Sequence, residues 1–501
     1  MAAPIRSRLT LAVALAACGG DAAPRPEAPR PLPTASAPAQ AKPADVLGPK
    51  PEPAAPPPFV PPVPVVYDHA RGMKVWLLER HTLPIVSTQC VIGTGASRDP
   101  KDKGGLAWAT ANMLDEGAGK RGPLEIARDL DRLGATLATG AYPDYSFAHL
   151  TVLKKNLSAA AAIYGDVLGK PSFSPVEWAR VHNLWKNDLE QRKSDPSAVA
   201  AVVVQARVFG SDHVYGHPTN GTTKSAGKIT LADVKSFYWT HWRSDQATCV
   251  VVGDVTRAEI DPVFDAAFAA WIPAKVGLIA GHSEPATRPG RRVVIVDRPD
   301  APQSVIAVGR RGVAARDAAT APLTRVNAAL GGSFTSRLNQ DLREEHGWSY
   351  GARSSFSFNA SKGIFVAQAA VHTEHTGDAL KAMLVDIDSL AKGGLTDDEV
   401  EKTRLLARGA LVEAFEGVES AAARLARNAG VGLPADHEAK TSLLVSSASK
   451  EELARLARQY LDLTTSEIVV VGPRAKVEPQ LRAIGIDKDK IELAGPEGET
   501  L

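Results

Sequence analysis

The sequence repeats itself at a spacing of about 218 residues, and this repeat restricts how the chain can fold. Lys74 corresponds to Arg292 at this spacing. Three pairs of stretches share it to within one residue: 73–80 with 291–298, 96–99 with 314–317, and 250–253 with 469–472. Self-similarity of this kind is typical of two tandem copies of one domain. A chain of 501 residues is also long enough for two domains of ordinary size and a tail.

Hydrophobic periodicity predicts a similar order of helices and strands in each copy. In the first copy we expect helices at 123–133, 157–168, 174–194 and 231–241, and a closing strand at 247–253. In the second copy we expect helices at 322–330, 336–346, 377–391, 397–413 and 449–460, with strands at 350–358 and 363–371. Apolar residues recur at three- and four-residue spacing in each helix, so each helix packs one face on a sheet. The fold class is therefore α+β, with two tandem homologous domains, each a mixed or antiparallel sheet with helices packed on it.

The N-terminus has the form of a bacterial export signal. Arg6 and Arg8 precede a nine-residue, almost wholly apolar run at 9–17. The run is too short to span a bilayer and ends in small residues, as signal peptides do. It closes on Leu15-Ala16-Ala17-Cys18, which resembles the site at which bacterial lipoproteins are lipidated on cysteine and cleaved.

Cys18 is therefore the expected lipidation site, and residues 1–17 are the expected signal peptide. The alternative is a plain secretory signal that is cut near Ala17. Gly19, and not an aspartate, would follow the lipidated residue. For a Gram-negative source we therefore expect a lipid anchor in the outer membrane, facing the periplasm, and not retention in the inner membrane.

Proline and alanine dominate the stretch after the signal, which has too few bulky apolar residues to fold and should be an extended tether. The chain then divides into five parts: signal peptide 1–17, tether 18–66, N-terminal domain 67–284, C-terminal domain 285–486 and tail 487–501. The net charge of +2 falls to zero once Arg6 and Arg8 are removed with the signal peptide. Such a balance gives no electrostatic reason to expect nucleic-acid binding.

Only Cys90 and Cys249 remain for the folded domains. Both lie in apolar runs that are typical of strands. A buried free cysteine behaves as a small apolar side chain. We therefore expect two buried free thiols and no disulfide framework.

Residues 105–114 (GLAWATANML) resemble the active-site helix of the pitrilysin/insulinase family of zinc metallopeptidases. In that family the pattern is G-L-A-H-x-x-E-H-M-L, where two histidines bind zinc and the glutamate activates water. The first histidine falls on Trp108, the glutamate on Ala111 and the second histidine on Asn112. An indole, a methyl group and a carboxamide cannot perform these roles. The resemblance covers nearly all of residues 65–486 and implies a degenerate zinc motif with no metal in this chain.

The helix expected at 174–194 resembles the helix that carries the third zinc ligand of the family. Asp188 and Glu190 are acids at about that place. A lone carboxylate does not hold zinc when the imidazoles are missing. We therefore interpret both acids as solvated charges on the surface of the helix.

The second copy keeps a functional pattern that the first has lost. Residues 330–338 and 342–350 match the C-terminal signature of the family, in which an arginine and a tyrosine seven residues later reach the zinc-bound substrate. Arg343 and Tyr350 have that spacing. A guanidinium and a phenol are directional donors that can stabilise an oxyanion. Gly347 should end the helix of Arg343 with a positive φ. The resemblance implies that Arg343 and Tyr350 still bind substrate; the alternative is that both residues are inherited and no longer used.

Other motifs give little evidence of a metal or catalytic site. His213 and His217 lie in a Gly/Pro-rich turn, and His372 and His375 lie between a strand end and a helix, so we expect solvated loop histidines and not metal sites. A phosphate-binding Gly-rich loop and a Gly-x-Ser-x-Gly elbow are missing from the sequence.

The resemblance implies an insulinase-like peptidase subunit that is inactive alone. We expect it to form half of a clam-like chamber with a partner that has an intact motif and holds the zinc. The pair would hydrolyse peptides or proteins in the periplasm, with Arg343 and Tyr350 acting across the chamber. The alternative is a non-enzymatic peptide-binding or scaffold protein of the same fold, and a third reading is a hydrolase that uses other residues.

Overall fold

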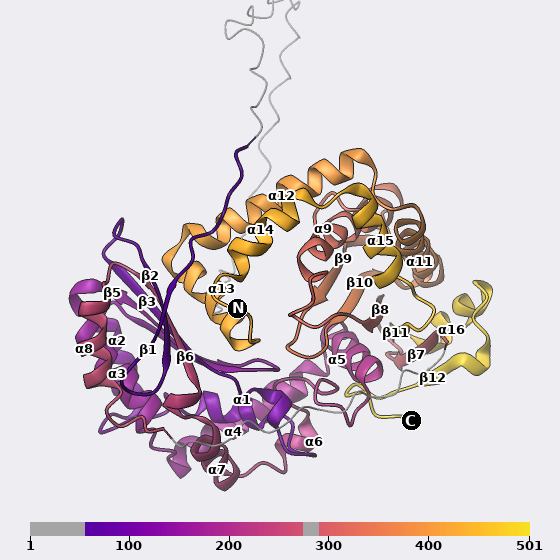
Figure 1. Cartoon of the computed structure of the whole chain (residues 1–501). Coiled ribbons are helices and arrows are strands. Elements are labelled where there is room, and N and C mark those ends of the chain that lie inside the picture. The colour runs from indigo at the N-terminus through magenta and orange to yellow at the C-terminus, as the bar shows by residue number, and fades with distance from the viewer. Residues whose placement is uncertain (1–55, 274–289) are drawn as a thin grey trace, which may run out of the picture. The chain divides into compact units, whose positions relative to one another are not determined.

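The computed structural model describes residues 56–273 and 290–501, and residues 57–501 form one compact unit (Figure 1). The expected signal peptide, Cys18 and the tether up to residue 55 lie outside the described residues. The boundary expected between residues 284 and 285 lies outside them as well. None of the helices in the described ranges combines the length and the apolar character that a transmembrane segment requires.

The first half of the compact unit is built on a six-stranded sheet. Its strand order is β1 (Val65–Asp68), β2 (Lys74–Glu79), β6 (Ala247–Gly253), β3 (Ile85–Ile92), β5 (Ser146–Leu153) and β4 (Thr136–Ala141). Strands β2 and β6 pair in parallel, and the other neighbours pair antiparallel. The closing strand β6 begins and ends where the sequence predicts it.

The second half repeats this sheet. Its strand order is β12 (Ile491–Leu493), β7 (Arg292–Asp297), β11 (Glu467–Gly472), β8 (Gln303–Arg311), β10 (Ile364–His372) and β9 (Ser349–Ser357). Five strands follow the order of their counterparts in the first sheet. The edge strand beside β7 differs: β12 pairs parallel with β7, whereas its counterpart β1 pairs antiparallel with β2. The predicted α+β class with two mixed sheets is confirmed.

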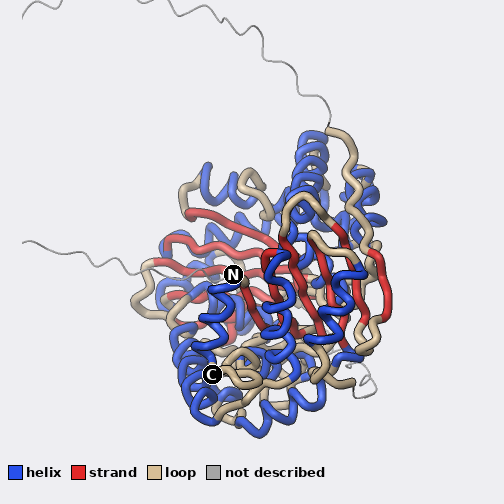
Figure 2. The backbone as a smooth tube through the Cα atoms, turned by 90° about the vertical axis from the view of Figure 1, so that its left-hand side faces the viewer, coloured by secondary structure: helices blue, strands red, loops and turns tan. Residues whose placement is uncertain are grey.

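Helices pack against the strands of both halves (Figure 2). The first half carries α1 (Leu106–Asn112), α2 (Pro123–Leu133), α3 (Leu157–Gly169), α4 (Pro175–Arg192), α5 (Pro196–Phe209), α6 (Thr223–Ala226), α7 (Leu231–His241) and α8 (Arg257–Ala267). The second half carries α9 (Thr320–Leu330), α10 (Arg337–Asn339), α11 (Thr376–Gly393), α12 (Asp397–Glu416), α13 (Val418–Gly430), α14 (His437–Ser447), α15 (Lys450–Tyr460) and α16 (Arg474–Ala483). The helix predicted at 336–346 is a short α10 that continues as a π-helical turn, η4 (Gln340–Glu345).

Two helices pack on the sheet of the opposite half. Helix α5 lies against β8 and β11 of the second sheet, and helix α13 lies against β3 and β6 of the first (Figure 1). Val203 of α5 shares a buried cluster with Val469 of β11, and Leu425 of α13 shares one with Val250 of β6. Helices therefore cover both faces of each sheet, which explains why central strands such as β3, β6 and β11 are buried at nearly every position.

Cys90 and Cys249 form a disulfide, so the prediction of two free thiols is wrong. Cys90 of β3 lies directly opposite Cys249 of β6 in the register of the first sheet, and both residues are fully buried. The sequence places both residues in strands. It does not show that the two strands are neighbours, and that pairing decides whether the sulfur atoms meet.

A buried tyrosine joins the two halves at the tips of two hairpins. Tyr215 is 2% exposed and donates its hydroxyl to Asp144, in the turn between β4 and β5. The Tyr215 oxygen accepts from Ser361 Oγ, in the turn between β9 and β10, at 3.0 Å. The backbone N–H of Ala360 donates to the second oxygen of Asp144 at 2.8 Å. The same few atoms therefore fix both hairpin tips.

Candidate functional site

Helix α1 begins at a tight turn that a buried carboxyl group stabilises. Gly105 precedes the helix with a φ of 100°, a conformation that glycine adopts readily. Asp99 accepts hydrogen bonds from the backbone N–H groups of Gly105 at 2.6 Å and Ala107 at 2.8 Å. Burial raises the pKa of Asp99 to about 8, although these N–H donors act in the opposite direction. The carboxyl oxygens thus accept from N–H groups that a helix start leaves without partners.

The three residues at the degenerate zinc motif are engaged with the protein itself. The indole of Trp108 packs on the indole of Trp185, with ring centroids 5.2 Å apart. Ala111 is fully buried in the core. Asn112 Nδ2 donates to the carbonyl oxygen of Trp108 at 2.8 Å, one turn earlier in the helix. The α1 surface therefore presents packed rings and a satisfied amide.

Helix α4 turns an apolar face toward α1. Trp185 is buried and donates its indole N–H to the carbonyl oxygen of Asn220 at 3.0 Å, and Leu189, one turn later, is fully buried. Asp188 and Glu190 are exposed, and Glu190 pairs with Lys193. The interpretation of these two acids as surface charges is confirmed.

These residues do not fit a zinc ion. A catalytic zinc site needs three imidazole, thiolate or carboxylate ligands that converge on one point. Here Trp108 contacts Trp185, and the two acids of α4 are exposed. Helices α1 and α4 therefore meet through an aromatic contact at this place.

Arg343 lies on the π-helical turn η4, with its guanidinium over an aromatic ring. Its Cζ is 4.4 Å from the ring centroid of Phe334. Its Nε is 3.6 Å from a carboxylate oxygen of the next residue, Glu344. Among the described residues, the guanidinium of Arg343 makes no hydrogen bond, so its donors remain available to a ligand.

Tyr350 is the second residue of β9 and is 89% exposed. Gly347 ends the preceding helical turn with a φ of 64°, as the sequence predicts. Its N–H donates to the carbonyl of Arg343 at 3.2 Å, and the N–H of Trp348 donates to that of Leu342 at 2.9 Å. In the ranges that the structure describes, no hydrogen bond joins Arg343 to Tyr350, so each side chain is presented separately.

Asn339 links the loop of Phe334 to the strand of Tyr350, a connection that the sequence did not reveal. Its Nδ2 donates to the carbonyl of Ser333 at 3.2 Å, and its Oδ1 accepts from the N–H of Ala352 at 2.8 Å. The side chain is nearly buried, so these bonds form away from water. An Asn at the start of a signature helix is the signal that could have pointed to this role.

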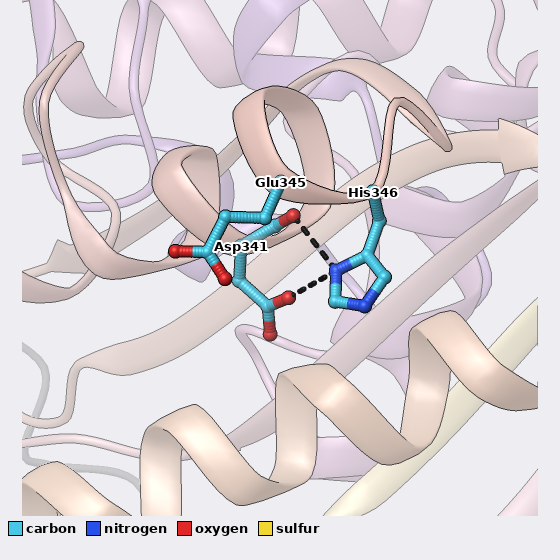
Figure 3. A group of neighbouring side chains, drawn as sticks. All are labelled: Asp341, Glu345 and His346. Atoms are coloured by element: carbon cyan, nitrogen blue, oxygen red, sulfur yellow. Dashed lines mark hydrogen bonds and ion pairs between the residues drawn. The ribbon is translucent and has the colours of Figure 1, made fainter.

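Asp341, Glu345 and His346 form a group of neighbouring side chains beside Arg343 (Figure 3). Over residues 56–273 and 290–501 it is the only group of three or more His, Cys, Asp or Glu side chains with metal-binding proximity. His346 Nδ1 lies 2.6 Å from a carboxylate oxygen of Asp341, and the Asp341 carbonyl and carboxylate raise the pKa of His346. An exposed Asp–His ion pair therefore accounts for the arrangement.

The histidines that the sequence singled out do not converge on a ligand. His213 stacks on Phe209 with centroids 5.3 Å apart, and His375 stacks on Trp348 at 5.4 Å. His217 is partly buried, and burial lowers its pKa. His372 is exposed at the end of β10.

Two family models match successive parts of the chain. A model described as "Insulinase (Peptidase family M16)" matches residues 74–219, and a model described as "Peptidase M16 inactive domain" matches residues 228–406. The first match includes α1 and α4. The second includes Arg343 and Tyr350.

Similar proteins and structures are known from several bacteria. An uncharacterized zinc protease of Mycobacterium tuberculosis is 26% identical over 419 residues, which are 80% of this chain and 93% of that protein. The crystal structure of a peptidase M16 inactive domain from Pseudomonas fluorescens superposes with a TM-score of 0.76 and 25% identity, over 82% of this chain and 98% of that one. The periplasmic protease PqqL from Escherichia coli shares the fold, with a TM-score of 0.67 and 14% identity over 87% of this chain and 51% of its own.

Proposed function

The chain belongs to the insulinase family, peptidase family M16, and from this premise we propose that it is the zinc-free subunit of a two-chain peptidase. In this proposal a partner with an intact zinc motif supplies the metal and the water. This chain supplies Arg343 and Tyr350. It holds no cofactor of its own.

The proposal rests on the contrast between the two halves of the chain. The α1 helix presents Trp108 packed against Trp185, where a metal would need ligands. The second half presents Tyr350 at 89% exposure and Arg343 with free guanidinium donors, on a turn that Gly347 shapes. A polar side chain that is exposed, or whose donors make no internal hydrogen bond, is well placed to act on another molecule.

In this proposal Arg343 and Tyr350 donate hydrogen bonds to a peptide carbonyl of the substrate. As the carbonyl carbon is attacked, negative charge develops on its oxygen. The Arg343 guanidinium and the Tyr350 hydroxyl would donate to that oxygen and hold the substrate in place. Preorganised donors of this kind stabilise the transition state more than the ground state.

The structural match to PqqL supports a two-chain assembly. PqqL shares this fold, and the present chain covers 51% of it. Two chains of this length would therefore supply as many domains as one PqqL molecule. The partner would contribute the zinc-bearing half.

We also propose that the chain works outside the cytoplasm, held to the outer membrane through a lipid on Cys18 and facing the periplasm. The export-type N-terminus motivates this location. The disulfide between Cys90 and Cys249 supports it, since such bonds form and persist in oxidising compartments.

Purification of the lipid-anchored chain from its own membranes tests the proposal. We expect a zinc-bearing family member to co-purify, and the pair to cleave peptides while the isolated chain does not. Arg343→Ala should lower turnover of the assembled pair by at least about a hundredfold, as expected for removal of one oxyanion donor. An isolated chain that binds stoichiometric zinc and cleaves peptides would refute the proposal. A stable assembly whose activity is indifferent to Arg343→Ala would favour the scaffold role instead.

A further inference from the structure

The guanidinium of Arg343 is positioned by an aromatic ring and not by an acid. Its Cζ lies 4.4 Å from the centroid of Phe334, whereas its ion pair with Glu344 is long, at 3.6 Å, and exposed. Exposed ion pairs of that kind hold a side chain weakly. A cation over a ring face is attracted by the negative face of the ring. This contact itself uses none of the N–H donors of the guanidinium.

Phe334 lies in a hydrogen-bonded loop, and the residue is 67% exposed. The N–H of Gly332 donates to the carbonyl of Asn327 at 2.7 Å. The hydroxyl of Ser333 donates to the carbonyl of Ala328 at 2.9 Å. These bonds tie the backbone next to Phe334 to the end of α9, so an anchored loop carries the ring.

The same loop is coupled to the strand that carries Tyr350. Asn339 donates to the carbonyl of Ser333, the residue before Phe334, and accepts from the N–H of Ala352, two residues after Tyr350. A single buried amide therefore sets the spacing between the support of Arg343 and the backbone of Tyr350. The geometry of the two donors depends on this loop as much as on their own elements.

We propose that Phe334 is the positioning residue of Arg343, and this inference rests on the proposed function of the Arg343–Tyr350 pair. The ring holds the guanidinium in place before substrate arrives, without using the donors that the substrate needs. Without the ring, the guanidinium is free to follow the carboxylate of Glu344. Its donors would then be partly consumed and wrongly placed.

Turnover of the assembled peptidase pair tests the role. We expect Phe334→Leu to lower kcat about two- to fivefold with KM nearly unchanged, the range for loss of an exposed cation–π contact. Phe334→Trp should keep kcat within about twofold, because an indole also attracts a cation. Leu124→Ala, which removes an apolar side chain that is 77% exposed on α2, should leave kcat unchanged. Thermal unfolding of each variant confirms that it is folded.

A double-mutant cycle separates positioning from a general structural effect. In the Arg343→Ala background, Phe334→Leu should cause no further loss of kcat, because the group that it positions is gone. If the two losses multiply, or if Phe334→Leu leaves kcat unchanged, the positioning role is overturned.

A measurement on the isolated chain distinguishes this inference from the proposed function. The Nε–Hε signal of Arg343 in a nitrogen-15 NMR spectrum should carry a ring-current shift that Phe334→Leu abolishes and Phe334→Trp retains. A signal that does not respond to Phe334→Leu overturns the positioning role, whatever the partner does. A signal that responds, together with an assembled pair that is indifferent to Arg343→Ala, supports the contact and refutes the proposed function.

Discussion

Reduction of the disulfide between Cys90 and Cys249 should destabilise the folded chain by about 5 kcal/mol. The two cysteines are 159 residues apart in the sequence, so the bond closes a long loop in the unfolded chain. The loss of chain entropy on closing a loop of this length corresponds to about 5 kcal/mol at 25 °C. Both sulfur atoms stay in the core after reduction, so packing changes little. The effect therefore falls mainly on the unfolded state.

Equilibrium unfolding in urea, followed by tryptophan fluorescence with and without a thiol reductant, measures this effect. With an unfolding slope of about 3 kcal/mol per molar urea, the midpoint should fall by about 1.7 M. The matched control is the Cys90→Ala/Cys249→Ala double variant, whose midpoint should not respond to the reductant. Two reactive thiols in the unreduced, denatured chain, apart from any on Cys18, would show that the bond does not form. A reduced chain with an unchanged midpoint would refute the entropic reasoning.

Two further predictions concern groups that organise the first half. Asp99→Asn should flatten the pH dependence of the melting temperature: burial raises the pKa of Asp99 to about 8, above about 4 in the unfolded chain, so its stabilising contribution is present below pH 4 and is lost as the pH rises toward 8. Equal slopes for wild type and variant between pH 5 and 8 would contradict this. Tyr215→Phe should cost about 1–3 kcal/mol, because it leaves the partly buried carboxylate of Asp144 without its hydroxyl donor. Thermal unfolding measures the loss, with Tyr145→Phe, another buried tyrosine, as the control expected to cost less.

Much of the fold could be predicted because hydrophobic periodicity and capping residues determine where the helices and strands lie. Helices α2 and α7 begin and end where periodicity and capping residues place them. The repeat at 218 residues indicates that the two halves share an architecture, and the two sheets show it. The exchange of α5 and α13 could not be predicted in this way. An apolar strand such as β6 indicates that both of its faces are covered, but the pattern carries no information about which helix covers each face.

In the candidate site, too, contacts between residues that are close in the sequence could be predicted, and contacts between distant residues could not. Arg343, Gly347 and Tyr350 lie close together in the sequence, so their spacing alone indicates a helix, a cap and a strand. Trp185 lies far from Trp108 in the sequence, and their contact depends on how α4 packs on α1. Phe334 is nine positions before Arg343, and neither a helix nor a strand brings residues at that spacing into contact. The loop between them decides it, and loops are the part of a chain for which residue patterns carry the least geometric information.

The crossing of α5 and α13 between halves also governs the order in which the molecule can assemble. Val250 and Val252 on one face of the first sheet have no cover until α13, which starts at Val418, is available. A polypeptide that is made or exported N-terminus first must therefore leave this apolar face of the first sheet uncovered until α13 has been made or exported. We therefore expect neither half to fold alone, and productive folding to wait for nearly the whole chain. We expect such a protein to need holding factors during its biogenesis more than two independent domains of the same size would.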